Sequence, residues 1–386
     1  MKTVIKSILN KLPLKLKLII IQKKGIIHFK NYKFIINAIN EAMKSYYRQE
    51  AKLPIIKEDI KIWEKAFKKF ILAQPNEVNV AKTFFTSEIK LIKKSSAKLG
   101  SGFNPILICV VKDDLYRIQQ LYHHYRNLGV KNFAILDNGS TDGTFEFLMR
   151  QNDTDLFRVE AKYTTMNREA WVNRLIAYYG FNRWYINVDS DELLIFNECE
   201  NKSIIDLINF FENNNITRAR ALMVDMYNEG RLFNSNVIDD IYNEFCYFDL
   251  NTYYKEETTA YFDEVRGGPR ERLFGHNPLL TKYPVFKFMP GDIQGKSHYQ
   301  FPYIKNKNSN CYLALLHYKF LPNDLLKYKN IAEQGNYHNG SIEYKKYIEV
   351  YNSQKSTTFY YNNSIRLTDS NSIYKIPLLL KVDWSS

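Results

Sequence analysis

Two aspartates separated by one residue, Asp189 and Asp191, form the pair in this sequence best suited to binding a divalent cation. They follow the apolar run from Trp184 to Val188, which is typical of a buried strand. Carboxylates in this position can bind Mg²⁺ or Mn²⁺ and leave sites open for water and phosphate oxygens. A solvated turn or a helix N-cap is the alternative, because Asp favours both positions. The place of the pair directly after a strand favours the metal site.

A second polar segment runs from Asp137 to Thr144 with the sequence DNGSTDGT, and it follows an apolar run at 132–136. In its Asn138-Gly139 step, the glycine allows the backbone to approach a ligand closely. Asp137, at a strand end, can accept hydrogen bonds from a ribose or a base. A plain turn is the alternative, since Asn-Gly is a common turn sequence.

Residues 103–320 resemble the GT-A glycosyltransferases of family 2, in particular a bacterial family-2-like branch related to family 92. The resemblance rests on six stretches in the family's order: ICVVKDDLYRIQQLYHHYRNLGV, FAILDNGSTDGT, AWVNRLIAYYG, RWYINVDSDELLIF, GGPRERLFG and LLHYKF. Asp113-Asp114 stands where relatives usually have Asn-Glu, so the acid is kept. Residues 1–100 are not covered by the resemblance.

The resemblance implies a nucleotide-diphosphate sugar donor, with UDP-sugars favoured, and a divalent metal, Mn²⁺ or Mg²⁺. It also implies inversion at the anomeric carbon and a glycan or lipid-linked acceptor, as in bacterial surface polysaccharide or lipopolysaccharide synthesis. Carried over by position, the donor and metal residues would be Lys112, Asp114, Asp137, Asn138 and Gly139 along the nucleotide, Arg174 near the diphosphate, and Asp189, Asp191 and His317 around the metal.

The reaction also needs a general base. A cation and a nearby arginine would stabilise negative charge on the leaving diphosphate, but the attacking hydroxyl must still lose its proton to a carboxylate. Glu271 is the first candidate, because Arg270 and Arg272 would keep it ionised. A surface ion pair with these arginines is the alternative, and Asp225 and Glu192 are the next candidates.

Two further positions have open roles. His317 would complete the metal site by resemblance, whereas a lone histidine is more commonly a half-buried structural residue. Asp292, Lys296 and His298 form a second polar loop that could meet the acceptor.

The elements that would position these groups alternate between strands and helices. The acids at 113–114, 137 and 189–191 follow expected strands, and parallel sheets bind ligands beyond the carboxyl ends of their strands. We therefore expect an α/β fold of GT-A, Rossmann-like type, with a mainly parallel sheet flanked by helices and a helical N-terminal extension. The expected strands are 106–111, 132–136, 157–161, 184–188, 219–226 and 313–320, and the expected helices are 115–128, 144–150 and 168–179.

Composition divides the 386 residues into three parts. Residues 1–100 contain 22 basic and 7 acidic residues, whereas the rest of the chain has a net charge of −2. We expect a basic helical region at 1–100, with helices within 34–73. A catalytic domain at 101–324 and a C-terminal tail or cap at 325–386 would follow, with a loop at Gly267–Arg270.

Residues 1–40 contain nine lysines and no acidic residue. Such a segment favours peripheral contact with an anionic membrane, a solvated arm, or packing on the catalytic domain. No apolar run approaches the ~20 residues of a spanning helix, and four cysteines without a C-x-x-C pair are typical of reduced thiols. We therefore expect a cytoplasmic protein that can lie at the inner face of the membrane.

Two other functional classes follow from the same features. A non-catalytic module of GT-A fold would hold nucleotide or glycan without turnover, but the intact acids at 114, 137, 189 and 191 argue against it. A nucleic-acid-binding protein would explain the basic charge, yet the sequence contains no recognised motif of that class, so no specific nucleic-acid partner is expected.

Overall fold

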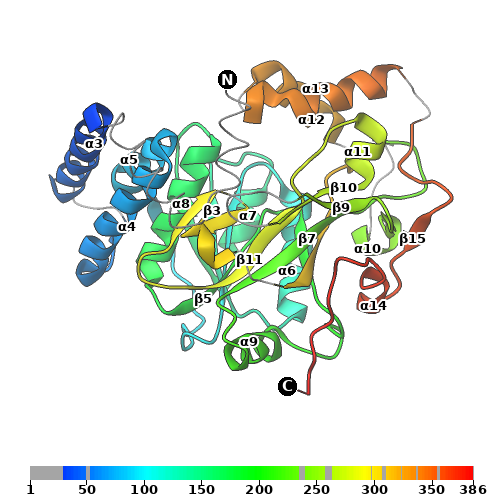
Figure 1. Cartoon of the computed structure of the whole chain (residues 1–386), viewed down its shortest axis with the longest axis horizontal. Coiled ribbons are helices and arrows are strands. Elements are labelled where there is room, and N and C mark those ends of the chain that lie inside the picture. Colours follow the sequence, from blue (N-terminus) through cyan, green and yellow to red (C-terminus); the bar gives the residue numbers. More distant parts are fainter. Residues whose placement is uncertain are drawn as a thin grey trace, which may run out of the picture.

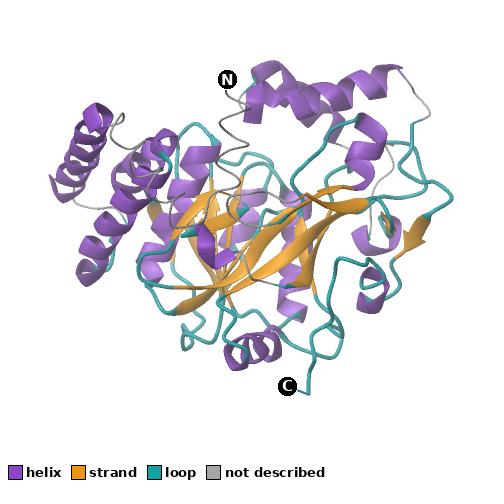
Figure 2. Cartoon of the chain, viewed as in Figure 1, coloured by secondary structure: helices purple, strands orange, loops and turns teal. Residues whose placement is uncertain are grey.

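The framework of the protein is one large sheet with helices on both faces (Figure 1, Figure 2). The computed structural model describes residues 29–48, 53–233, 240–256, 263–296, 298–306, 310–322, 324–335, 338–353 and 357–385. In spatial order, the strands of this sheet are β1 (Lys90–Lys93), β4 (Thr154–Arg158), β3 (Asn132–Asp137), β2 (Ile106–Val111), β5 (Arg183–Asn187), β11 (Thr281–Phe288), β7 (Arg218–Asp225), β14 (Cys311–His317) and β6 (Glu192–Ile195).

Most strands of the sheet run in one direction. β4, β3, β2, β5, β7 and β14 are mutually parallel in direction, and β1, β11 and β6 run against them. The predicted α/β fold with a mainly parallel sheet is therefore confirmed.

The two faces of the sheet enclose separate hydrophobic cores. Leu107 and Cys109 of β2 enter one core, and Ile106 and Ile108 enter the other, because successive side chains of a strand point to opposite faces. The first core is covered by α6 (Leu115–Asn127), α7 (Thr144–Met149) and α9 (Ile204–Asn213), and the second by α8 (Thr165–Tyr179).

The N-terminal helices α3 (Phe29–Arg48), α4 (Ile60–Ala73) and α5 (Val78–Thr86) lie beside α8, at the left of Figure 1. Trp63 of α4 is fully buried, and its ring centroid lies 5.6 Å from that of Phe288 on β11. These helices share the second core with the sheet, and β1 pairs with β4. The described part of residues 1–100 therefore packs as part of the α/β framework, while residues 1–28 of the basic segment lie outside the description.

At the C-terminal side, α12 (Asp324–Gln334) and α13 (His338–Ser353) pack together, and α13 contacts α11 (Gly268–Phe274), as Figure 1 shows at its upper right. Aromatic side chains fill the space between them; Phe274 and Tyr347 have ring centroids 4.6 Å apart. The residues predicted as a loop at Gly267–Arg270 are instead the end of β10 at Gly267, where φ is 99°, and the start of α11.

The remaining described elements are short. β9 (Tyr253–Glu256) pairs with β10 (Glu264–Gly267), β12 (Ile293–Lys296) with β13 (Tyr299–Phe301), and β8 (Tyr247–Asp249) with β15 (Ser364–Arg366). The others are α10 (Ile241–Glu244), α14 (Ser370–Ile373) and the 3-10 turns Lys57–Asp59, Pro75–Glu77 and Tyr303–Asn306.

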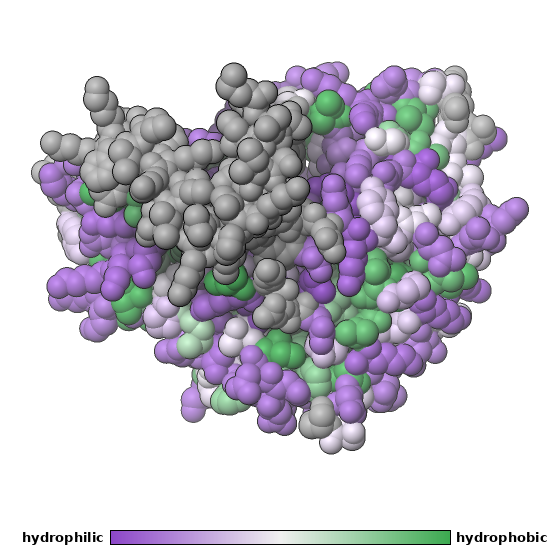
Figure 3. Space-filling view, viewed as in Figure 1, coloured by the Kyte–Doolittle hydropathy of each residue, from purple (hydrophilic) through white to green (hydrophobic). Residues whose placement is uncertain are grey.

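Apolar groups on the surface are scattered. Leu326, Ile304 and Tyr47 are each more than 60% exposed but lie on different elements. Figure 3 likewise shows apolar residues as separate groups among hydrophilic ones on the face it draws. Such scattered residues do not by themselves indicate a binding surface. Among the helices that the structure describes, none combines the length and hydropathy of a membrane-spanning segment.

Candidate functional site

Several of the polar residues predicted from the sequence lie at one edge of the sheet. Asp137 ends β3, next to the end of β2, and Asp189 follows β5, the neighbour of β2 on the other side. On the far side of β11, His317 of β14 pairs in register with Asp225 of β7. These strands share one direction, so their carboxyl ends form a common edge where ligands of such sheets bind.

Asp189 lies between two cationic side chains. Its Oδ1 accepts a hydrogen bond from Arg168 Nη2 of α8 at 2.5 Å, and its Oδ2 accepts one from Lys282 Nζ of β11 at 3.1 Å. Burial disfavours the charged carboxylate, but Arg168 and Lys282 outweigh burial and lower the pKa of Asp189. In this arrangement the charge of Asp189 is balanced by the protein's own side chains.

His317 joins Asp191 to Asp225. Its Nδ1 lies 2.6 Å from Asp225 Oδ1, and its Nε2 lies 3.3 Å from Asp191 Oδ2. Burial disfavours the imidazolium, but the two carboxylates outweigh burial and raise the pKa of His317. When the ring is neutral and Nδ1–H donates to Asp225, the lone pair of Nε2 points toward Asp191.

This donor set fits a divalent cation. A ligating imidazole usually donates its other N–H to a carboxylate, which fixes its tautomer, and Asp225 is placed to do so. Asp191 would add a hard oxygen ligand of the kind that Mn²⁺ and Mg²⁺ accept. Within the described residues, no three His, Cys, Asp or Glu side chains form a ready metal-binding group. Other ligands would therefore come from water and substrate.

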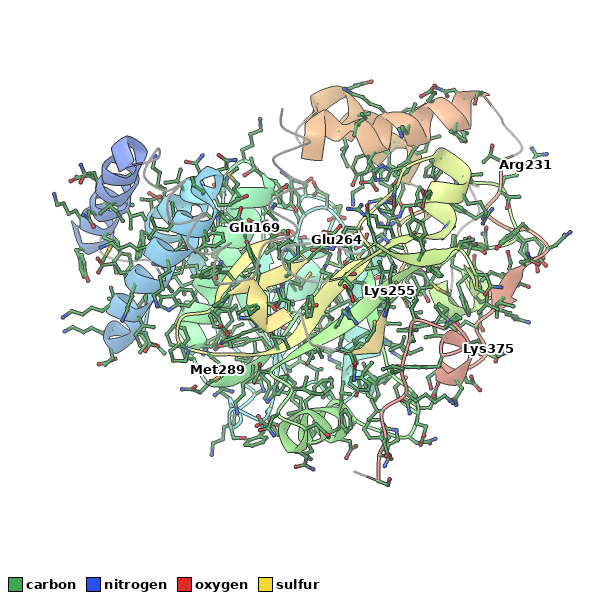
Figure 4. The ribbon with its side chains drawn as sticks, viewed as in Figure 1. Glu169, Arg231, Lys255, Glu264, Met289 and Lys375 are labelled. Carbon is green, nitrogen blue, oxygen red and sulfur yellow. The ribbon has the colours of Figure 1, made fainter. Side chains whose placement is uncertain are left out.

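Two buried guanidinium groups at this edge each keep one nitrogen without a hydrogen-bond partner among the described residues, Nη1 of Arg168 and Nη2 of Arg270. Arg270 Nε donates to Asp225 at 2.8 Å, and its Nη1 donates to Glu343 of α13 at 3.1 Å. In Figure 4 the labelled Glu169 marks the part of α8 that carries Arg168. A buried unpaired donor is costly, and phosphate oxygens would satisfy both arginines.

The turn after β3 buries Asp137 completely. Its carboxylate accepts a hydrogen bond from the backbone N–H of Gly139 at 3.1 Å and lies 3.6 Å from Arg158 Nη1. The amide of Asn138 donates to two main-chain carbonyls at 2.9 and 3.0 Å, so this side chain holds the turn in place. Gly139 has φ 74° and open space where a Cβ would point, which leaves its backbone accessible to a ligand.

Asp114 connects the site to the C-terminal helices. Its carboxylate accepts hydrogen bonds from Ser190 Oγ and, at 3.1 Å, from Arg117 Nη1. Arg117 Nη1 also donates to Asp324 of α12 at 3.1 Å. Lys112 is exposed just beyond β2, on the same edge of the sheet.

Arg174 does not reach this edge. Its guanidinium donates to the main-chain carbonyls of Phe84 and Leu53 at 3.2 and 2.6 Å and lies 4.7 Å from the ring centroid of Tyr46. The structure therefore places Arg174, which was predicted to approach the diphosphate, away from this edge. Arg174 lies on the side of α8 that faces the N-terminal helices, and Arg168, on another side of the same helix, reaches Asp189 instead.

Glu271, the first candidate for the base, does not pair with its neighbouring arginines. It accepts a hydrogen bond from Tyr254 Oη at 3.2 Å. Arg270 points inward to Asp225, and Arg272 Nη2 donates to Asp249 at 2.9 Å. Adjacent residues of a helix point in different directions, so the expected cluster around Glu271 is not formed.

The other two candidates for the base are engaged in ion pairs. Asp225 is 1% exposed, and although burial disfavours its charge, Arg270 and His317 lower its pKa and so weaken its basicity. Glu192 is also 1% exposed and accepts hydrogen bonds from Lys282 Nζ at 2.6 and 2.5 Å. Both carboxylates thus hold neighbouring side chains in position.

Arg168, Lys282 and Glu343 complete the site, and the sequence analysis did not identify them. The signal for Lys282 was a lysine within the mostly apolar stretch from Leu279 to Phe286, most of which belongs to β11. Glu343 comes from α13, far along the chain, and no local pattern marks it.

Known structures share part of this architecture at low similarity. S. aureus TarS is 11% identical over 64% of this chain and 71% of that chain, with a TM-score of 0.29. The mannosyltransferase PcManGT from Pyrobaculum calidifontis, in complex with GDP-Man and Mn²⁺, is 12% identical over 43% of this chain and 46% of its own, with a TM-score of 0.24. A nucleotidyl transferase from Methanothermobacter is 14% identical over 34% of this chain and 68% of its own, with a TM-score of 0.21. The sequence matches no protein-family profile and no curated protein.

Proposed function

We propose that this protein is a metal-dependent glycosyltransferase that moves a sugar from a nucleoside-diphosphate sugar to an acceptor hydroxyl. The observation that carries the proposal is the position of the His317 ring at the carboxyl edge of the sheet. Asp225 holds Nδ1 of this ring, and Nε2 lies 3.3 Å from Asp191. Two guanidinium nitrogens without partners among the described residues, on Arg168 and Arg270, support an anionic ligand at the same place.

Each residue then has a task that its contacts support. Asp191 and His317 would hold the divalent cation, which supplies stabilisation of the negative charge on the leaving diphosphate. Arg168 and Arg270 would donate hydrogen bonds to phosphate oxygens from fixed positions, so little reorganisation is needed as charge develops. Asp225 keeps the proton of His317 on Nδ1.

The finer assignments belong to the same proposal. Asp137, Gly139, Asp114 and Lys112 would line the nucleoside, and a UDP-sugar is the favoured donor. The acceptor would be a glycan or a lipid-linked glycan of bacterial surface polysaccharide synthesis, transferred with inversion. The basic segment at 1–40 would bring the protein to the inner face of the membrane.

A donor screen tests this function. UDP-, GDP- and CMP-sugars are added to the full chain with Mn²⁺, with Mg²⁺ and with EDTA, and both the melting temperature and donor hydrolysis are measured. We expect one donor class to raise the melting temperature only with metal, since a ligand at 100 times its Kd stabilises by about 2.7 kcal/mol. Binding without hydrolysis or transfer would indicate the non-catalytic module, and absence of any shift would contradict the proposal.

A further inference from the structure

His298 lies beside the start of β11, close enough to Asp189 for the charge of that carboxylate to act on its imidazole. β11 pairs with β5 from Val285 onward, so the start of β11 extends beyond the end of β5 that leads to Asp189. There the main-chain carbonyl of His298 accepts a hydrogen bond from Tyr283 N of β11 at 3.0 Å. The β12–β13 hairpin thus lies beside the part of β11 that does not pair with β5.

The contacts of His298 lead directly to the site. Its Nδ1 lies 2.9 Å from the main-chain carbonyl of Thr281, the residue before Lys282. Lys282 in turn binds Asp189, the first residue of the proposed metal and donor segment. Arg270, Lys282 and Asp189 are the charged groups that act on the imidazole of His298 from the surrounding elements.

The tautomer of His298 is fixed. A carbonyl oxygen can only accept, so Nδ1 carries the proton and Nε2 presents a lone pair. No described residue forms a hydrogen bond with Nε2. Burial, followed by the positive charge of Lys282, lowers the pKa of His298 to about 4, so the ring is neutral near pH 7.

Carboxylates near the site are already engaged with cationic side chains. Asp191 is paired with His317, and Glu343 accepts hydrogen bonds from Arg270 and Tyr347. Together with the ion-paired Asp189, Asp225 and Glu192, these acids leave the Nε2 of His298 as an uncommitted base beside the site.

We propose that His298 Nε2 is the general base of the transfer reaction. The acceptor oxygen bonds to the anomeric carbon while the bond from that carbon to the diphosphate oxygen breaks, and its electron pair leaves on the diphosphate. The proton of the acceptor hydroxyl passes to His298 Nε2 and is then released to water. This assignment rests on the proposed function and names a residue of the same site.

Replacing His298 by Ala in the full chain tests the assignment. Donor affinity is measured by calorimetry with Mn²⁺, and the transfer rate is measured with the donor that the wild type uses. We expect the transfer rate to fall about 10²- to 10³-fold, within the range typical of general base catalysis, while the donor Kd changes less than about threefold. His123→Ala, on the exposed side of α6, is the matched control and should behave as wild type.

Glu271→Gln is measured in parallel, because Glu271 is the rival base. Transfer retained in His298→Ala, or lost in Glu271→Gln while His298→Ala stays active, would overturn the assignment. So would a loss of donor affinity in His298→Ala that matches the loss of rate, since His298 would then hold the donor. Failure of the proposed function itself would appear differently, as a wild-type chain that binds no donor.

Discussion

Replacement of Asp191 by Asn is expected to lower the rate of sugar transfer about 10³-fold and to abolish its dependence on Mn²⁺. The amide keeps the size of the carboxylate but removes the negative charge that would hold the cation against His317, 3.3 Å away. Loss of metal stabilisation of the leaving diphosphate would cost several kcal/mol, and about 4 kcal/mol corresponds to the stated factor. Steady-state rates over a Mn²⁺ titration provide the measurement.

The control for Asp191→Asn is Asp153→Asn. Asp153 lies just before β4, at the amino end of that strand, and pairs with the partly exposed Arg126 at 2.8 Å. We expect wild-type rates and an unchanged Mn²⁺ requirement in this control. If Asp191→Asn kept the wild-type response to Mn²⁺, Asp191 would not be a metal ligand.

Replacement of Lys282 by Met should destabilise the protein by about 3–5 kcal/mol, the usual cost of removing one partner from a buried ion pair. Lys282 and Glu192 are each 1% exposed, with Nζ 2.6 Å from one carboxylate oxygen. Without the ammonium, the carboxylate of Glu192 would remain buried and unbalanced. The free energy of unfolding from urea titrations measures the loss, and soluble yield reports a variant that fails to fold.

Two variants make the Lys282 result specific. Lys287→Met, on the same strand, breaks a partly exposed pair with Glu212 at 2.8 Å and should cost less than about 1 kcal/mol. Adding Glu192→Gln to Lys282→Met should recover part of the lost stability, because the buried charge is removed as well. Equal losses in Lys282→Met and Lys287→Met would show that burial of the first pair has no energetic consequence.

The parts of the fold that could be predicted are those with a strong local pattern. β2 and β3 are short apolar runs that are buried along their whole length, and their predicted bounds agree with the structure to within one residue. The strand predicted at 157–161 is wrong by three residues, because β4 begins with Thr154 and Asp155. Both polar residues are buried, and their side chains form hydrogen bonds with distant residues, Thr154 with Tyr122 and Asp155 with Lys94. A local pattern does not reveal these partners.

The candidate site shows the same limit. The sequence places Asp137, Asp189 and Asp191 after strands, and parallel topology is sufficient to bring such residues to one edge. It does not show which side of α8 faces the sheet edge and which faces the N-terminal helices, so Arg174 was chosen where Arg168 is placed. β11 was not predicted, and with it the pairing of Lys282 with Asp189 and the position of His298 were missed.

The central claim is that His317 and Asp191 bind the same divalent cation beside the nucleoside diphosphate. Electron spin echo spectroscopy of Mn²⁺ bound to the full chain with UDP or GDP tests this claim directly, because an imidazole ligand gives nitrogen modulation. We predict that the wild type and His298→Gln show this modulation and that His317→Gln does not. Bound Mn²⁺ without nitrogen modulation in the wild type, or modulation that persists in His317→Gln, would contradict the claim.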